Sequence, residues 1–333
     1  APATTWTAAL LFAAIAIGSI VGLASPATGD LLSQGVDSTL LVMIFLLFFE
    51  LRFGAIIKAL KNLRFLALAW CANFIFVPLI AFVIASVVLT GEPLLFAGLM
   101  IYFLAPCTDW FLGFTRMAQG DAELGAALIP VNLITQLLLF PLWLWVFTEH
   151  AGLVDFAAIP DLLAQWFLLP LLAAQLLRMG LEKTIPPRAF DLVMSSTGRL
   201  VPLSLAALIL QLFAANIGVI GSNIGGFALI GLGVFFFFIT TLVVGRQLAK
   251  LGRLDYPQEA LLAMTMAARN APMMLAVTAV AIPGEPLILA AIVFGMLIEI
   301  PHLTILRQLL LRRRSKLRRN NQSQRFGEID PVS

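Results

Sequence analysis

The chain has 333 residues, of which 61% are hydrophobic and 12% are charged, and its mean hydropathy is +0.99. Soluble globular proteins contain about 45–50% apolar and about 25% charged residues, so this composition excludes a soluble fold and indicates a polytopic membrane protein. The net charge of +3 is concentrated in loops and in the run Arg312–Arg319, which we interpret as a cytoplasmic anchor on anionic membrane lipids rather than a nucleic-acid site. The two cysteines, Cys71 and Cys107, both lie in apolar segments, which argues against a disulfide framework.

A helix needs about 20 apolar residues to cross a bilayer. By this measure the chain contains ten candidate transmembrane helices, and the first is interpreted as a span rather than a cleavable signal peptide. They lie near residues 6–24, 37–52, 64–89, 94–117, 124–148, 161–180, 199–217, 224–249, 257–281 and 286–311. We expect one transmembrane transporter domain over residues 1–311, made of a five-helix repeat (about 1–150) and a second one (about 155–311) in inverted topology. Residues 312–333 are rich in Arg, Asn and Gln and are expected to form a disordered cytoplasmic tail.

The charges of the loops support this count. Lys and Arg residues occur in alternate loops and in the tail, at Arg52, Lys58, Lys61, Arg64, Arg116, Arg178, Lys183, Arg188, Arg199, Arg246, Lys250 and Arg253. The intervening loops contain Asp30, Glu92, Glu149, Asp155 and Glu285 and no Lys or Arg. The positive-inside rule then predicts a multi-pass protein of the cell's inner (plasma) membrane with both termini in the cytoplasm.

Spans four and nine are each interrupted at a proline beside a polar cluster. The two segments read Leu104-Ala105-Pro106-Cys107-Thr108-Asp109-Trp110 and Ala267-Ala268-Arg269-Asn270-Ala271-Pro272. Paired, interrupted helices at matching positions of two halves indicate the binding site of a secondary transporter. Asp109 and Arg269 should both lie near the membrane midplane, where an isolated charge is costly, so we expect them to pair. The pair is interpreted either as a structural lock or as a working pair in which Asp109, the member that can titrate, carries a proton.

Other polar residues of the spans are further candidates. Cys107 lies at the break itself, and its position favours equally a soft ligand for a metalloid and a small buried apolar side chain. In span five Asn132 recurs at helical spacing with Thr135 and Gln136, which predicts either a polar face toward the break in span four or hydrogen bonds between helices.

In span ten, Glu299 is another intramembrane acid, and His302 shares its helix face. Two such ligands are too few for a closed metal site, so no metal is expected. The sequence also lacks a Walker-type glycine loop, a dinucleotide fingerprint and a Ser-His-Asp order. We therefore expect neither an enzyme nor a cofactor.

These motifs, taken together, resemble the arsenite permeases of the Acr type, which belong to the bile acid/arsenite/riboflavin transporter superfamily. The similar stretches are Ala105-Pro106-Cys107-Thr108 in span four, Leu254-Asp255-Tyr256 and Ala267-Ala268-Arg269-Asn270 in span nine, and Leu297-Ile298-Glu299-Ile300-Pro301 in span ten. The resemblance covers nearly the whole chain. It implies an all-α fold like that of the bile acid:sodium symporters, with ten helices in inverted five-helix repeats and broken helices four and nine that cross. It also implies export of arsenite driven by proton antiport, with Cys107 as the reactive cysteine.

The chain departs from this family in span nine. Where the arsenite permeases usually carry a glutamate after their Asn pair, this chain has Met273, and it has Asp109 and Arg269 instead. The related bile acid:sodium symporters bind sodium with side chains that correspond here to Phe111, Leu112, Thr265 and Arg269. An arginine at a sodium ligand repels the cation, so the resemblance makes sodium a less favoured coupling ion than the proton.

The sequence therefore predicts a secondary active transporter that exports arsenite, with antimonite as a further candidate substrate, in exchange for protons. The residues expected to bind or transport the solute are Cys107, Thr108, Asp109, Asn132, Arg269, Asn270 and Glu299. In this scheme Cys107 contacts the metalloid, and Asp109 alternates between pairing with Arg269 and carrying a proton. The alternatives are an organic-anion carrier that binds a carboxylate or sulfonate at Arg269, and a non-transporting membrane sensor of the same fold.

Overall fold

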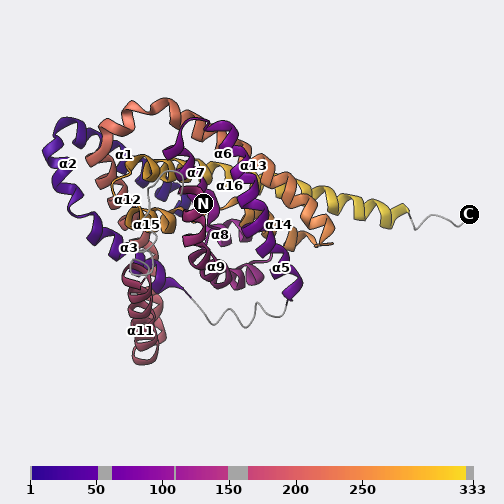
Figure 1. Cartoon of the computed structure of the whole chain (residues 1–333). Helices are drawn as coiled ribbons and strands as arrows, with labels where there is room; N and C mark the ends of the chain where they lie inside the picture. The colour runs from indigo at the N-terminus through magenta and orange to yellow at the C-terminus, as the bar shows by residue number, and fades with distance from the viewer. Residues whose placement is uncertain (1, 52–61, 109, 149–163, 328–333) are drawn as a thin grey trace, which may run out of the picture.

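The computed structural model describes residues 2–51, 62–108, 110–148 and 164–327, and these are almost entirely helical (Figure 1). The helices of the first half are α1 (Pro2–Ala24), α2 (Pro26–Ser33), α3 (Val36–Glu50), α5 (Leu63–Cys71), the π-helix η3 (Ala72–Phe76), α6 (Val77–Val88), α7 (Pro93–Leu104), α8 (Trp110–Met117) and α9 (Ala122–Thr148). Those of the second half are the π-helix η5 (Ala164–Leu168), α11 (Leu169–Thr184), α12 (Pro187–Ser222), α13 (Ile224–Leu251), α14 (Tyr256–Ala267), α15 (Ala271–Ala281) and α16 (Pro286–Gly327).

Many of these helices begin with chemistry that the sequence supplies. Proline occupies one of the first two positions of α2, α7, α12, α14 and α15, where its missing N–H group is not needed. The side chains of Ser25, Asn62, Asp255 and Asn270 accept hydrogen bonds from backbone N–H groups in the first turns of α2, α5, α14 and α15. The caps of α14 and α15 matter most, because these two helices flank the break in span nine.

The helices pack in two groups. The first, called here the α12 group, consists of α1, α2, α3, α11 and α12, which lie against one another (Figure 1). The second, called the crossover group, contains α5 to α9 and α13 to α16. The two groups meet where α12 and α1 contact α16 and where α3 contacts α15. A cavity of about 260 Å³ lies at this meeting, lined by α12, α15 and the start of α16, beside the kink of α12 at Asn216.

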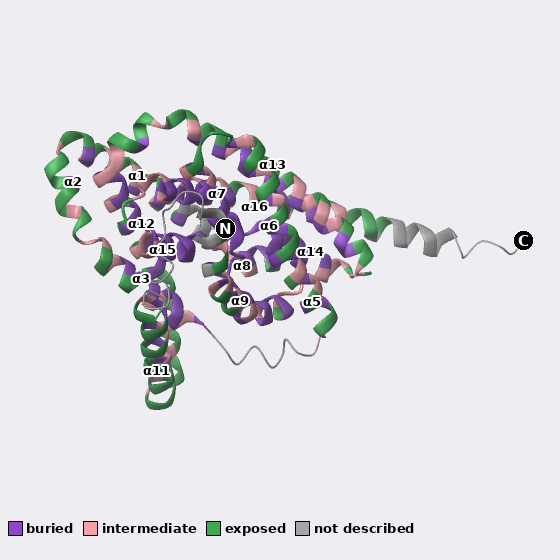
Figure 2. Ribbon diagram, in the orientation of Figure 1, coloured by how far each residue is buried: buried purple, intermediate pink, exposed green. Residues whose placement is uncertain are grey.

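Buried residues are densest along α7, α14, α15 and the first half of α16, whereas the outer faces of α2, α11 and α13 are largely exposed (Figure 2). Many of the exposed side chains are large and apolar, for example Leu23, Val87, Leu138 and Ile224. Such a surface is unusual for a protein in water and fits contact with lipid chains. The interior of the crossover group is therefore the place where polar side chains need protein partners.

Close packing of α7 on α16 positions the centre of this group. A Cβ atom at Gly98 of α7 would lie 2.6 Å from the Cβ of Ala291 and 2.7 Å from the carbonyl oxygen of Ile288. A Cβ atom at Gly295 of α16 would lie 2.8 Å from the ring of Tyr102. The two glycines thus allow the helices to approach closely, and they bring Tyr102 against α16.

Six helices of the described residues are long and apolar enough to cross a membrane, and the bent pair α2–α3 makes a seventh. The multi-pass, all-helical membrane fold is thereby supported. The remaining predicted spans fall on α1, whose apolar part is short, and on the pairs α7–α8 and α14–α15, whose halves are each too short alone. The count of ten spans and the inverted repeat therefore remain predictions.

The C-terminal tail differs from the expectation. The sequence predicts disorder after Leu311, whereas α16 continues as a helix to Gly327. Arg313 forms a salt bridge of 3.0 Å with the buried Glu259 of α14, and the guanidinium of Arg314 lies 5.4 Å from the ring centroid of Tyr256. These contacts give this part of α16 partners on α14, and the exit of these residues from the membrane stays a prediction from their composition.

Candidate functional site at the crossing of two broken helices

The breaks in spans four and nine lie across one another and are joined through their backbones. Between α7 and α8, and between α14 and α15, the chain is extended, and Pro106 forms an isolated antiparallel bridge with Arg269. The Cys107 N–H donates to the Ala268 carbonyl over 3.0 Å, and the Asn270 N–H donates to the Ala105 carbonyl over 2.9 Å. Backbone groups inside a membrane need partners, so each break supplies the hydrogen bonds that the other has lost.

Proline explains where the break in span four falls. Pro106 has no N–H to continue the helix, and the residue before a proline is disfavoured in the helical conformation. Ala105 accordingly has φ −105° and ψ 116°, which is extended backbone. In span nine Ala268 is extended as well, with φ −82° and ψ 134°, and Pro272 stands near the start of the next half-helix.

Arg269 lies fully buried at the crossing, with 0% of its surface exposed. Its Nη1 donates to the carbonyl of Phe103 over 3.0 Å. Its Nη2 donates to the carbonyls of Thr265 and Met266 over 2.5 and 2.8 Å and to Oδ1 of Asn73 over 3.4 Å. The guanidinium also faces the ring of Phe237, 5.8 Å from its centroid, and is thus held from several sides.

Glu299 of α16 is the buried acid at the same place. Its Oε2 accepts a hydrogen bond of 2.9 Å from the hydroxyl of Tyr102, and its Oε1 accepts one of 3.2 Å from the backbone N–H of Arg269. It thus contacts the backbone of the break in span nine, while the guanidinium binds carbonyl oxygens. Opposite charges are nonetheless close together in an interior that excludes water.

A network of amide and hydroxyl groups extends from Arg269 into spans three and five. Thr265 accepts hydrogen bonds from Asn73 over 3.0 Å and from Asn132 over 3.5 Å. Asn73 belongs to the π-helix η3, a local widening that is common at functional sites. Asn132 belongs to α9 and contacts α14 through Thr265. The side-chain oxygen Oδ1 of Asn132 has no hydrogen-bond partner among the described residues.

Cys107 and its neighbours lie on the extended segment of span four. Cys107 is buried and is not part of a disulfide. The next residue, Thr108, accepts a hydrogen bond of 3.2 Å from the side chain of Asn270, which also caps α15 at Met273. The hydroxyl of Thr108 and the amide of Asn270 are therefore neighbours at the crossing, and the buried Cys107 is the residue before Thr108. Asp109 lies outside the described residues, so its expected pairing with Arg269 remains a prediction.

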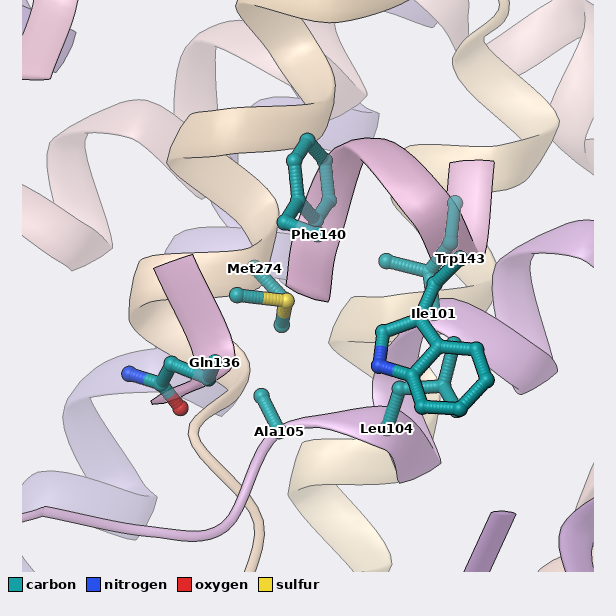
Figure 3. Close-up of a pocket in the computed structure, with 7 residues that line it drawn as sticks. All are labelled: Ile101, Leu104, Ala105, Gln136, Phe140, Trp143 and Met274. Carbon is teal, nitrogen blue, oxygen red and sulfur yellow. The ribbon is translucent and has the colours of Figure 1, made fainter. Parts of the chain in front are cut away.

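A small cavity adjoins the crossing between α7, α9 and α15. Figure 3 shows its lining, in which Gln136 and Met274 face Ala105 of the extended segment and Phe140 and Trp143 stand beside Ile101 and Leu104. Its volume is about 10 Å³, close to what one water molecule needs. The buried amide of Gln136 has no hydrogen-bond partner for either its nitrogen or its oxygen among the described residues. A small polar solute would find unused hydrogen-bonding groups here.

The structure thus gathers most of the expected residues at one place. Cys107, Thr108, Arg269, Asn270 and Glu299 all lie at the crossing, and Asn132 reaches it through Thr265. Of the other residues of span five, Gln136 lines the small cavity, whereas Thr135 accepts a hydrogen bond from Trp70.

His302 does not join Glu299 in a shared site. Its Nδ1 makes a hydrogen bond with the carbonyl of Ile298, and its ring stacks on that of Phe238 at 4.2 Å. In the part of the chain that the structure describes, no group of three or more His, Cys, Asp or Glu residues could hold a metal ion.

The contacts of two residues at the site were not predicted from the sequence. Tyr102 donates to Glu299, and Thr265 joins two asparagines. Tyr102 had a signal, since it is one of only two tyrosines in the chain and stands in an apolar stretch. Thr265 had a signal only in the resemblance, which places it at a sodium-ligand position of the bile acid:sodium symporters, because a threonine in a membrane helix usually bonds to its own helix backbone.

The comparisons with known proteins agree with this geometry. Residues 38–224, more than half of the chain, match the family model described as the Sodium Bile acid symporter family. The chain is also similar to the "Arsenical-resistance protein Acr3" of Corynebacterium glutamicum, with 24% identity over 277 residues that cover 79% of this chain and 74% of that protein. The chain therefore belongs to the sodium bile acid symporter family and is a multi-pass membrane transporter, not an enzyme.

Proposed function

We propose that the protein exports arsenite, in exchange for protons, through the crossing of the two broken helices. The observation that carries the proposal is the buried thiol of Cys107 on the extended segment, whose next residue, Thr108, bonds to Asn270. Thiolates are soft ligands that favour soft metals and metalloids. A relative named for arsenical resistance adds independent support.

The surroundings of the thiol fit a small neutral solute. Arsenite is an uncharged hydroxide at neutral pH, and hydroxide groups need donors and acceptors rather than a charge. Asn132 and Gln136 present buried amide atoms that have no partner among the described residues. In this proposal Cys107 displaces one hydroxide of arsenite as water and forms a transient sulfur–arsenic bond, while the amides and Asn270 bind the remaining hydroxides.

The burial of Arg269 argues against an organic anion as substrate. Its guanidinium already donates to four protein oxygens, and none of its surface is exposed. A carboxylate or sulfonate would have to displace these oxygens.

The test is arsenite uptake into everted membrane vesicles with and without an imposed pH gradient. We expect gradient-driven accumulation by the native chain, a loss of at least tenfold in Cys107→Ala, and little change in Cys71→Ala, because Cys71 lies in α5 away from the crossing. Asp109→Asn should abolish the dependence on the gradient, since we assign the exchanged proton to that carboxyl group. Folded native protein that accumulates no more arsenite than empty vesicles do would overturn the proposal.

A further inference from the structure

Four protein oxygen atoms accept hydrogen bonds from the two Nη atoms of Arg269, whereas its buried Nε has no partner among the described residues. They are the carbonyl oxygens of Phe103, Thr265 and Met266 and the side-chain oxygen of Asn73, all from uncharged groups. They come from α7, from α14 and from the π-helix, so three separate elements converge on one positive charge. This arrangement needs an explanation, because burying an arginine in a membrane protein is costly.

The three carbonyl groups are those that the crossing leaves without helical partners. In an unbroken helix they would accept from the N–H groups four residues later, those of Cys107, Arg269 and Asn270. Instead the Cys107 N–H donates to Ala268, the Asn270 N–H donates to Ala105, and the Arg269 N–H donates to Glu299. The unpaired carbonyls of two half-helix C-termini, each the negative end of a helix dipole, therefore meet at one point.

The three carbonyl oxygens favour a cation between the half-helix ends, which can be either a side chain or a free ion. Unwound carbonyls and half-helix C-termini are the groups with which secondary transporters bind coupling cations. The nearby carboxyl group of Glu299, which accepts from the Arg269 N–H, adds further oxygen acceptors. Without a positive charge, three carbonyl oxygens would lack donors in the interior, where each unsatisfied group is costly.

We propose that the Arg269 guanidinium is a tethered substitute for a sodium ion, and that it fills a cation site which becomes a sodium site when the side chain is shortened. The native transporter is then complete at the crossing without sodium, although it belongs to a family named for sodium symport. The inference does not rest on arsenite as substrate, because it concerns the cation that holds the two breaks together.

The test is thermal unfolding of the purified full chain in sodium chloride and in choline chloride at equal ionic strength. The native chain should melt at the same temperature in both salts. Arg269→Gln should melt several degrees below the native chain in choline and recover most of that loss in sodium, with a saturable dependence on sodium concentration. It should also bind radiolabelled sodium, which the native chain should not.

Two further variants act as controls. Arg269→Lys keeps a tethered cation and should stay indifferent to sodium. Arg178→Gln removes another buried arginine, which donates to the carbonyls of Phe49 and Leu51 at the end of α3. It should lower the melting temperature equally in both salts, because a single helix end lacks the converging oxygens.

Three results would overturn the proposal. The first is sodium stabilisation of the native chain over choline. The second is equal melting of Arg269→Gln in the two salts. The third is failure of Arg269→Gln to fold in sodium as well as in choline, since the proposed site predicts that sodium replaces the lost charge. Each is independent of whether arsenite is transported.

Discussion

Several buried polar groups at the crossing have a specific neighbour far away in the sequence. Glu299 illustrates this, because the hydroxyl of Tyr102 and the N–H of Arg269 each occupy one of its two oxygens. The sequence identified Glu299 from its position inside an apolar span, since an acid at membrane depth needs a partner or a function. It did not identify the partner, because Tyr102 is 197 residues away along the chain.

Tyr102→Phe provides a measure of this contact. Removing the hydroxyl leaves one buried oxygen of Glu299 without its donor, which should lower the free energy of unfolding by about 1–3 kcal/mol. Tyr256→Phe is a matched control, because that hydroxyl donates to the Ala118 carbonyl at a partly buried position and its loss should cost only about 0.5–1.5 kcal/mol. Denaturation monitored by tryptophan fluorescence would compare the two. Equal stability of Tyr102→Phe and the native chain would show that the contact is not formed.

At the scale of helices, the central feature is that spans four and nine each consist of two short helices, α7–α8 and α14–α15, in place of one long helix. The prolines at 106 and 272 and the polar residues beside them predicted both interruptions. The antiparallel bridge between the breaks could not be read in the same way, since it joins backbone groups that are separated by more than half of the domain. The half-helix ends then meet because each break accepts the hydrogen bonds of the other.

Gly98→Ala tests the helix packing that supports this arrangement. The added methyl group would meet the Ile288 carbonyl and the Ala291 Cβ, neither of which can rotate away, so α7 and α16 would have to separate. We expect a loss of about 1–3 kcal/mol in stability, as for other overpacked interiors. Gly231→Ala should be neutral or slightly stabilising, because a Cβ there lies 3.7 Å from its nearest neighbour and alanine favours the helix. Thermal melting of both variants would decide the point, and equal melting of the two would contradict it.

At the scale of the whole molecule, two groups of helices meet along α12, α16, α3 and α15 beside a cavity of about 260 Å³. The orientation of this body in the membrane is a prediction from charge alone. Lysines and arginines gather in alternate loops, and these loops remain in the cytoplasm because transferring their charge across the bilayer is unfavourable.

Labelling of two exposed loop positions tests that orientation. Glu92 precedes α7 and Lys250 lies in the last turn of α13, and both are exposed. In intact cells an impermeant maleimide should label Glu92→Cys at once, whereas Lys250→Cys should react only after the membrane is opened. The native chain, whose Cys107 is buried and whose Cys71 is partly buried, measures the background. Labelling of both variants from the same side would contradict the assignment and alter the count of spans by one.

The helical membrane fold, the two interrupted helices and most of the residues at the crossing could be predicted from the sequence alone. This is possible because membrane solvation acts on each segment separately. Long apolar runs must become helices, prolines must break them, and polar residues inside them stand out against their neighbours. The contacts of Arg313 and Arg314 with α14, by contrast, lie beyond local composition and could not be predicted from it.

The partners of the Arg269 guanidinium, in contrast, depend on how the helices are arranged in space. From the sequence, the natural partner of Arg269 was Asp109, because opposite charges attract. In the fold the guanidinium contacts carbonyl oxygens that become available only when two particular breaks cross, and its pairing with Asp109, which lies outside the described residues, stays a prediction. Backbone carbonyls are the same in every residue, so no sequence pattern marks them. Which of them lack partners is decided by how the helices end and meet in space.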